Sequence, residues 1–190
     1  MVPYVMFSKR LKRVAQGLMK TRYNAIHVRR GGGHTRIDRR TARHYLDLHI
    51  LPAKMNASLP LYVATDERNK SWFSAMTREG YSLVFWSDLV RDEENNRVVS
   101  ELMAEYPKDM RGDIIGFLEQ LLCARAVKWT GSDGSTFSWS IDAMRRYLPL
   151  REIDWMQAAQ SARYAKIYSK DGEGAVGETA LMETETAQQE

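Results

Sequence analysis

The chain has 190 residues, of which 44% are hydrophobic, and it carries one cysteine and a formal net charge of +4. A chain of this length can bury one sizeable core, so we expect a single domain. One cysteine excludes an internal disulfide. No run approaches the roughly 18 to 20 apolar residues needed to span a bilayer, so no membrane contact by this chain itself is expected.

Charge is distributed unevenly along the sequence. Residues 169–190 hold one lysine against six acidic residues, a net charge of −5, which leaves +9 on the rest. The same segment has almost no large apolar side chains to offset the entropy lost on ordering. We therefore predict a domain over 1–168 and a disordered acidic tail over 169–190.

The positive charge before residue 169 would also suit a nucleic-acid partner, but the arrangement of the basic residues disfavours that class of partner. Six arginines lie between positions 29 and 43, while the aromatic residues are dispersed through apolar segments rather than interleaved with them. Nucleic acid is thus the weaker interpretation and is not expected as a partner.

The apolar pattern alternates between helical and strand-like segments. Leu11, Val14, Ala15 and Leu18 recur at helical spacing behind Ser8, a helix N-cap. Short apolar runs typical of buried parallel strands follow at 23–28, 61–64, 82–86 and 126–130. Helical patterns lie at 42–51, 67–79, 95–105, 113–125 and 136–148.

This alternation predicts an α/β fold with a mostly parallel sheet. In such sheets, ligands bind at the carboxyl ends of the strands. The loops that follow residues 28 and 130 both emerge there, so we expect two loops roughly a hundred residues apart to share one site.

The first of these loops carries two arginines, in His27-Val28-Arg29-Arg30-Gly31. Side chains alternate along a strand, so Arg29 shares the face of His27 and only one of the two arginines points easily into a given cleft. A guanidinium can hold a phosphate bidentately and offset the charge of a diphosphate leaving group. Arg29 and Arg30 are therefore candidate phosphate ligands, and the alternative is a pair of solvated surface arginines.

The second loop is rich in hydroxyls and opens a helical pattern, in Gly131-Ser132-Asp133-Gly134-Ser135-Thr136-Phe137-Ser138. Hydroxyls and backbone N–H groups at a helix N-terminus bind phosphate, so Ser135 and Thr136 are candidate ligands. Phe137 is a candidate for a ring lying against a base. An ordinary N-cap uses the same geometry, and an aromatic residue at a helix start is more commonly core.

Two carboxylates precede or open predicted helices. Asp113 begins the pattern at 113–125, where it either complements the helix dipole or accepts both N–H groups of a guanine edge. Asp66 follows the second strand, and we interpret it as the N-cap of the helix at 67–79. The sequence contains no Asp-x-Asp metal motif.

Four motifs in this order resemble the GDP-fucose protein O-fucosyltransferase family and its relatives in the wider fucosyltransferase group. The resemblance spans roughly residues 7–148. The motifs are His27-Val28-Arg29-Arg30-Gly31; Leu61-Tyr62-Val63-Ala64-Thr65-Asp66-Glu67; Asp113 with Leu118-Glu119-Gln120 and Cys123; and Gly131-Ser132 with Ser135-Thr136-Phe137-Ser138 and Met144-Arg145.

The resemblance implies a Rossmann-like, three-layer domain, the donor-binding half of a GT-B fold, with an acceptor-binding half preceding residue 1. It implies inverting transfer of fucose from GDP-fucose to a hydroxyl of a protein or glycan acceptor, with no metal and no cofactor besides the donor substrate. Arg29 would bind the β-phosphate and stabilise the departing GDP, and His27 and Asp113 would contact the guanine. The implied contacts to the phosphates and the base side come from Ser135, Thr136 and Phe137.

The chain departs from the family pattern at Gly32, where members commonly carry Asp and where Asp38 is the candidate replacement. A second interpretation therefore stays open: a catalytically inactive or truncated GDP-sugar-binding module. For location, the resemblance favours the lumen of the secretory pathway (ER or Golgi), and the cytoplasm stays open because some related enzymes work there.

Overall fold

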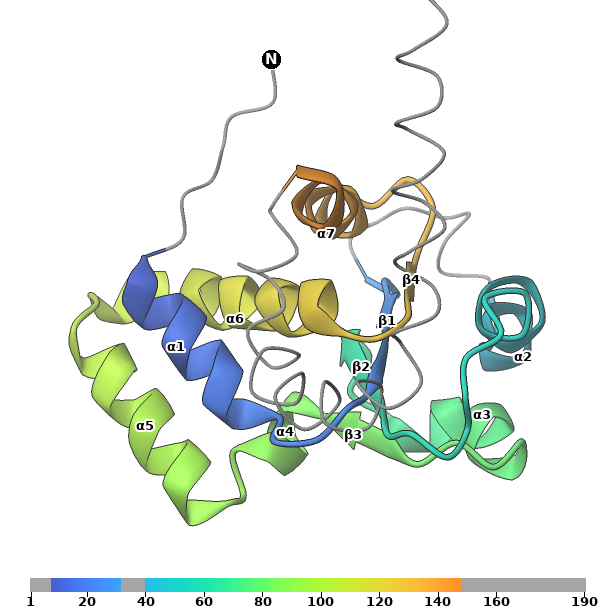
Figure 1. The fold of residues 1–190 in the computed structure, drawn as a ribbon, viewed down its shortest axis with the longest axis horizontal. Coiled ribbons are helices and arrows are strands. Elements are labelled where there is room, and N and C mark those ends of the chain that lie inside the picture. The colour runs from blue at the N-terminus through green and yellow to red at the C-terminus, as the bar shows by residue number, and fades with distance from the viewer. Residues whose placement is uncertain (1–7, 32–39, 148–190) are drawn as a thin grey trace, which may run out of the picture. The chain divides into compact units, whose positions relative to one another are not determined.

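The computed structural model describes residues 8–31 and 40–147 (Figure 1). Their α-helices are α1 (Lys9–Leu18), α2 (Ala42–Tyr45), α3 (Ser74–Arg78), α4 (Trp86–Leu89), α5 (Glu93–Ala104), α6 (Arg111–Arg125) and α7 (Thr136–Tyr147). Their strands are β1 (Asn24–Val28), β2 (Leu61–Thr65), β3 (Leu83–Phe85) and β4 (Trp129–Gly131). A π-helical segment, η1 (Leu46–Ile50), continues α2, and two 3₁₀ segments are η2 (Lys70–Phe73) and η3 (Lys108–Met110).

The four strands of the described residues form one parallel sheet in the order β3-β2-β1-β4. Central β1 pairs with β2 along its whole length, and with β4 from Ala25 opposite Trp129 to His27 opposite Gly131. The predicted α/β class with a parallel sheet is confirmed. Because β1 and β4 are parallel neighbours, the loops that leave them start at the same edge of the sheet.

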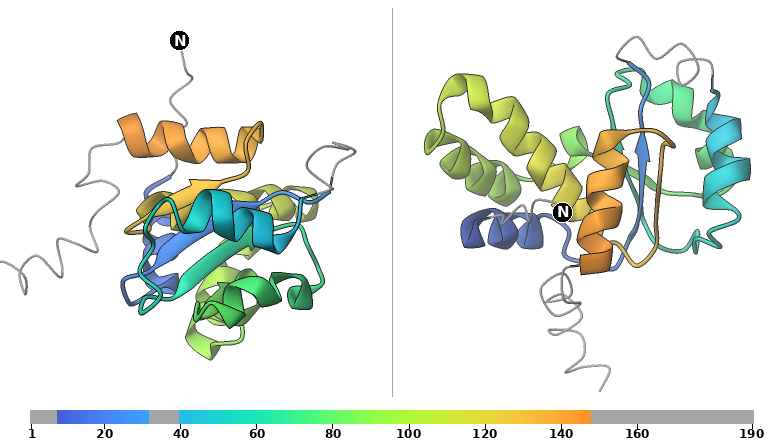
Figure 2. Two further views of the ribbon diagram at one scale, coloured as in Figure 1. Left: turned by 90° about the vertical axis from the view of Figure 1, so that its right-hand side faces the viewer. Right: turned by 90° about the horizontal axis from the view of Figure 1, so that it is seen from above.

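Helices cover both faces of this sheet (Figures 1 and 2). On one face, α6 packs on β1 and β2, α1 packs on α6 and α5 packs on α1, whereas α2, η1 and α3 lie on the other face. Side chains alternate along β1, so His27 points away from the core that the α2 side buries. That core includes Ile26, Val28, Tyr45, Leu46, Ile50, Leu61, Val63, Phe73 and Met76.

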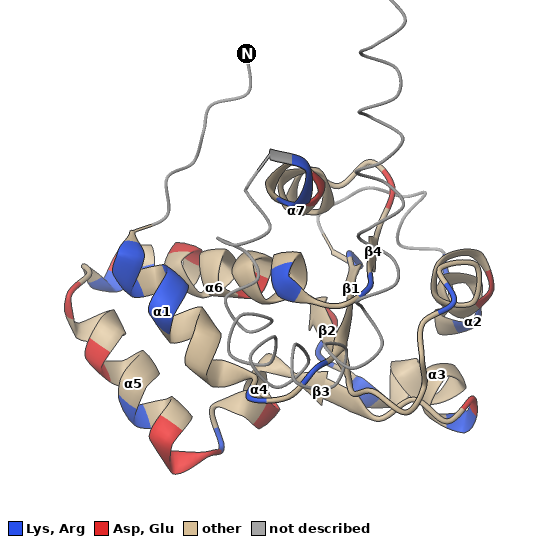
Figure 3. Cartoon of the chain, in the orientation of Figure 1, with Lys and Arg blue, Asp and Glu red and all other residues tan. Residues whose placement is uncertain are grey.

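The outer helices α1 and α5 carry complementary charge. The cap predicted for α1 is confirmed, because the Ser8 hydroxyl accepts the amide of Leu11 at 3.2 Å. Arg10 pairs with Glu105, and basic residues mark α1 while acidic residues mark the start of α5 (Figure 3). Exposed ion pairs contribute little to stability, so apolar packing holds α1 and α5 in place.

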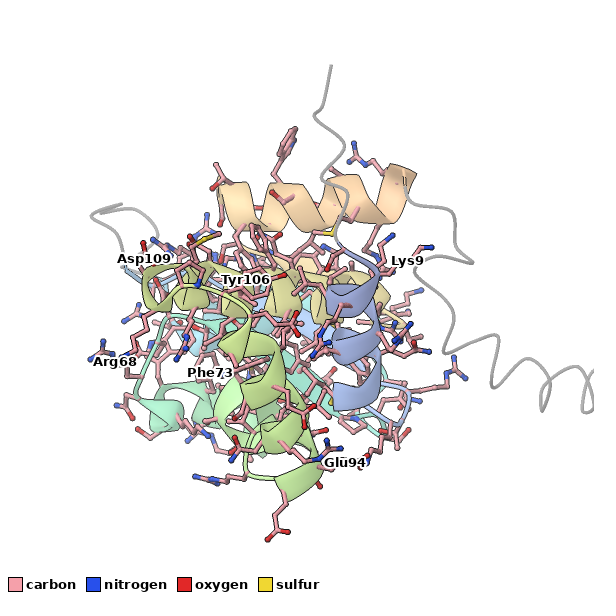
Figure 4. All side chains as sticks on the ribbon, turned by 90° about the vertical axis from the view of Figure 1, so that its left-hand side faces the viewer. Lys9, Arg68, Phe73, Glu94, Tyr106 and Asp109 are labelled. Carbon is pink, nitrogen blue, oxygen red and sulfur yellow. The ribbon has the colours of Figure 1, made fainter. Side chains whose placement is uncertain are left out.

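Figure 4 shows Lys9 and Arg68 at the periphery and Phe73 among packed side chains.

Element boundaries differ from the predictions where side chains redirect the backbone. The strand predicted over 82–86 ends at Phe85, since the Asp88 carboxylate accepts the amide of Phe85 at 3.0 Å and the chain turns into α4. The helix predicted over 67–79 begins later, at η2, behind an Asn69 cap. The predicted strand at 126–130 is shorter and later, as β4 at Trp129–Gly131, although α6 ends at Arg125 as predicted.

The predicted boundary between domain and tail, at 168/169, lies outside the described residues. Within residues 8–31 and 40–147, no helix is long and apolar enough to cross a bilayer.

One carboxyl lies between α6 and the sheet. Tyr62 on β2 donates its hydroxyl to Glu119 on α6 at 3.0 Å. Burial raises the pKa of the Glu119 carboxyl to about 7, and the hydrogen bond from Tyr62 opposes that rise. The folded chain therefore binds the proton of Glu119 more tightly than the unfolded chain does.

We expect Glu119→Gln to stabilise the protein selectively at high pH. The folded pKa of about 7 exceeds the ordinary value of 4.5, so stabilisation by the bound proton is full below pH 4.5 and is lost as pH rises through 7. At pH 8 the substitution should raise the free energy of unfolding by up to about 3 kcal/mol, and at pH 4.5 it should change little. Urea unfolding at both pH values measures this.

The matched control is Glu101→Gln, because Glu101 lies on α5, is half exposed and pairs with Arg97 one turn earlier on that helix. It should change stability little at either pH. An equal effect of Glu119→Gln at pH 4.5 and pH 8 would contradict the assignment of a protonated buried carboxyl.

Candidate functional site

The candidate site is the edge of the sheet where β1 and β4 end. From β1 the chain proceeds to β2 and β3 on one side, whereas β4 lies on the other side of β1. Such a reversal of strand order is the topological switch point, outside which α/β sheets bind ligands. The loops that carry the two candidate motifs flank this point, as predicted.

His27 is the last but one residue of β1 and is 4% exposed. Its Nδ1 lies 2.8 Å from the Ser138 hydroxyl of α7, and its ring centroid lies 4.5 Å from that of Phe137. Burial lowers the pKa of His27 to about 4, with Arg29 adding to this and Asp66 opposing it. At neutral pH the ring is therefore an uncharged hydrogen-bonding group joined to the first turn of α7.

Gly131 permits this close approach of α7 to β1. A Cβ at position 131 would lie 2.5 Å from Ser138 Oγ and 2.8 Å from Cζ2 of Trp129. Both distances are shorter than real Cβ atoms show. A side chain here would push α7 away from His27.

Arg29 leaves β1 with its backbone and its side chain held separately. Its amide donates to the Ser132 hydroxyl at 2.8 Å, and its Nη1 lies 3.2 Å from Asp66 Oδ2. The Arg29 side chain is 40% exposed. The guanidinium is thus accessible at the sheet edge, with one carboxylate beside it.

Asp66 has a different role from the one predicted. Its carboxylate accepts the amides of Arg30 at 2.7 Å and Gly31 at 2.8 Å, so the helix-cap interpretation is wrong. Each of the two carboxylate oxygens thus accepts one of two consecutive backbone N–H groups. A Cβ on Gly31 would lie 3.0 Å from Asp66 Oδ2, so a small residue suits this contact.

Arg30 contributes its guanidinium to the loop that follows β1. Its Nε lies 3.2 Å from Glu67 Oε2, its Nη1 donates to the carbonyl of Arg40 at 3.0 Å, and its Cζ lies 4.7 Å from the Trp72 ring centroid. These contacts hold the side chain beside η2. Arg30 and Arg29 therefore point to different partners, which agrees with the expected alternation.

The hydroxyl-rich segment opens α7 as predicted. Ser135 immediately precedes the helix, and its carbonyl accepts the amide of Trp139 at 2.9 Å. Thr136 is exposed, and Phe137 is partly buried against His27. The positive end of the α7 dipole therefore lies at the candidate site.

Asp113 lies in the exposed first turn of α6. Gly116, one turn later on the same side of the helix, approaches the Phe137 ring, since a Cβ there would lie 3.9 Å from Cε2. The helix that carries Asp113 thus passes beside Phe137. The structure brings His27 directly against Phe137, links Arg29 to the same loop through Ser132, and brings the first turns of α6 next to Phe137.

Sequence reasoning missed three hydroxyl groups at the site: Tyr45, Ser132 and Ser138. Ser132 and Ser138 lie within the segment singled out, but a hydroxyl that binds the protein and one that binds a ligand have the same sequence signal. Tyr45 lies on α2, which carries no motif. The register of β1 against β4 brings Ser132 and Ser138 beside His27, and Tyr45 reaches Ser132 from α2.

Among the residues with a described position, no group of three or more His, Cys, Asp or Glu side chains could hold a metal ion. Comparison with protein-family models, curated proteins and solved structures found no match for this chain.

Gly131→Ala should destabilise the protein by about 1 to 3 kcal/mol, since overpacking forces the backbone or Ser138 to shift. The matched control is Gly112→Ala in α6, where a Cβ would meet nothing within 4 Å. Alanine is the better helix former, so the control should be neutral or stabilising by up to about 1 kcal/mol. Thermal unfolding compares the two, and equal behaviour would contradict the close approach of α7.

The pKa of His27 should lie far below that of an ordinary histidine. Its folded pKa of about 4 is lower than the ordinary 6.5, so its contribution to stability is full above pH 6.5 and is lost as pH falls through 4. The loss approaches about 3 kcal/mol. NMR titration should give the folded pKa, and His27→Gln should weaken the dependence of unfolding on pH between 6.5 and 4. A His27 that protonates near pH 6.5 would refute its burial as a neutral ring.

Proposed function

We propose that this chain contains the donor-binding half of an inverting, metal-independent fucosyltransferase that uses GDP-fucose. The observation that carries the proposal is the convergence of His27 and Arg29 with the start of α7 at one switch point. The four ordered motifs and their resemblance to the O-fucosyltransferase family supply the substrate class. The acceptor is a hydroxyl of a protein or glycan.

The chemistry of the edge suits a diphosphate. Arg29 offers a partly exposed guanidinium, and the N-terminus of α7 offers backbone N–H groups with Ser135 and Thr136 beside them. Inverting transfer forms a bond from the acceptor oxygen to fucose C1 as the bond from C1 to the β-phosphate oxygen breaks. Arg29 would stabilise the charge that develops on the departing GDP.

The base side of the donor would lie against the His27 and Phe137 pair. An uncharged His27 can hydrogen-bond to a nucleobase without the desolvation penalty of a cation. Asp113, on the helix that passes Phe137, would accept the N–H groups of the guanine edge. Arg30 would support the β1 loop, since its guanidinium is already bound to Glu67 and to the Arg40 carbonyl.

The strand order supports the finer fold assignment within this proposal. The order β3-β2-β1-β4 matches the first four strands of the Rossmann arrangement 3-2-1-4-5-6. Helices on both faces give three layers, as expected for the donor half of a GT-B enzyme. The acceptor-binding half and the general base would come from another domain.

A second candidate is a GDP-sugar-binding module without transferase activity. Two observations favour it: Gly32 stands where the family commonly has Asp, and Arg29 is already paired with Asp66. GDP binding without fucose transfer or donor hydrolysis, in the longest native gene product, would support this candidate over the enzyme.

Calorimetric titration with GDP-fucose, GDP-mannose and UDP-sugars tests the donor class. We expect the chain to bind GDP-sugars in preference to UDP-sugars. Arg29→Ala should weaken GDP binding by about 10- to 100-fold, the scale of hydrogen bonds to a charged group. In a full enzyme it should lower turnover by about 10² to 10³.

The matched control is Arg91→Ala, because Arg91 is a largely exposed arginine that pairs with Asp88 after β3, a strand adjacent to neither β1 nor β4. Its affinity for GDP should equal that of the unmodified chain. Preference for a UDP-sugar would overturn the donor assignment, and unchanged GDP affinity in Arg29→Ala would overturn the role of that residue.

A further inference from the structure

The Ser132 hydroxyl joins three segments beneath the candidate site. Ser132 is 1% exposed and follows β4. Its Oγ accepts the amide of Arg29 at 2.8 Å, lies 2.8 Å from the Tyr45 hydroxyl of α2, and lies 3.3 Å from the carbonyl of His27. The Ser132 amide donates to the same carbonyl at 3.0 Å.

One arrangement of protons uses the full hydrogen-bonding capacity of the Ser132 hydroxyl. A serine hydroxyl has one donor and two acceptor sites. If Ser132 donates to the His27 carbonyl, it can accept from both the Arg29 amide and the Tyr45 hydroxyl. The Tyr45 proton is then used at 2.8 Å on Ser132 rather than at 3.4 Å on the Arg29 carbonyl. No hydrogen-bonding capacity of the serine hydroxyl is left over.

Tyr45 is itself held firmly, so it can orient Ser132. Its side chain is fully buried in the core between α2 and the sheet. Its ring stacks on His49, with centroids 5.3 Å apart, and meets the edge of Trp72 at 6.0 Å. Neighbouring rings packed against Tyr45 restrict its position, which is the requirement for a residue that fixes a binding group from behind.

We propose that Tyr45 and Ser132 are positioning residues that fix the backbone of Arg29 and thereby aim its guanidinium at the donor phosphate. The proposal rests on the proposed function and assigns to that site two residues from outside the ligand-contacting set. Arg29 is the first residue after β1, and the pairing of β1 with β2 ends one residue earlier, at Val28. The Arg29 amide therefore has no partner in the strand ladder. The Ser132 hydroxyl replaces the missing ladder bond.

The hydroxyl of Tyr45 is the part to remove, since Tyr45→Phe keeps the packing of the ring. We expect Tyr45→Phe and Ser132→Ala to raise the dissociation constant for GDP about tenfold, the scale of one lost hydrogen-bonded contact. Calorimetry with the 190-residue chain measures the affinity, and thermal unfolding of the same samples measures stability.

Tyr81→Phe is the control for the stability effect. Tyr81 is also buried, and its hydroxyl donates to the Met55 carbonyl at 3.1 Å, away from the β1 and β4 loops. Tyr81→Phe should lower the melting temperature as Tyr45→Phe does, yet leave GDP affinity unchanged. A merely structural role for Tyr45 would give both variants the same affinity as the unmodified chain, which would overturn the proposal.

Amide hydrogen exchange tests the same idea without a ligand. In Ser132→Ala the Arg29 amide should exchange at least about tenfold faster, because its acceptor is gone. The Ala25 amide at the other end of β1 donates to the Lys128 carbonyl and should stay protected. Unchanged exchange at Arg29 would overturn the positioning role.

The two proposals fail in distinguishable ways. If the unmodified chain does not bind GDP, the proposed function fails. Faster exchange of the Arg29 amide in Ser132→Ala still supports the positioning role in that case, and unchanged exchange still overturns it.

Discussion

The register between β1 and β4 is the constraint on which the rest of the candidate site depends. Because His27 lies opposite Gly131, the two strands end within one residue of each other, and the loops that follow them start side by side. A one-residue slip would turn His27 to the core face and send Ile26 or Val28 toward α7. The apolar core under α2 holds the register, because it needs Ile26 and Val28 on its own side.

Charge at the edge is balanced within the protein. Arg29 faces Asp66, and Arg30 faces Glu67, so each arginine after β1 is matched by a carboxylate after β2. The two acids differ in what else they do, since Asp66 also accepts two loop amides. This arrangement fixes the first residues after β1, and a phosphate that reaches Arg29 would compete with Asp66 for the same guanidinium.

Much of the fold followed from the sequence because its signals are local. Alternation of apolar runs with helical patterns predicts the parallel sheet, and the segment 131–138 predicts the start of α7. The pairing of Arg30 with Glu67 and the two amide bonds to Asp66 depend on contacts 35 to 37 residues apart, which no local pattern contains. The helix predicted from Glu67 failed for a related reason: the Asp66 carboxylate is used by another segment, and Asn69 caps the helical turns instead.

The distribution of roles between the two faces of the sheet limits what the described site can do by itself. The α7 side supplies an uncharged imidazole, an aromatic ring and a helix N-terminus, all suited to a base and phosphates. The α2 side supplies rigidity, through Tyr45 and its ring partners. Under the proposed function, a diphosphate leaving group requires charge stabilisation and fixed geometry more than proton transfer at this edge, and Arg29 and the groups that hold it would provide both. A base that activates an acceptor must approach from the opposite side of the sugar, so under the proposed inverting chemistry the catalytic unit is completed by groups facing this edge rather than by those within it.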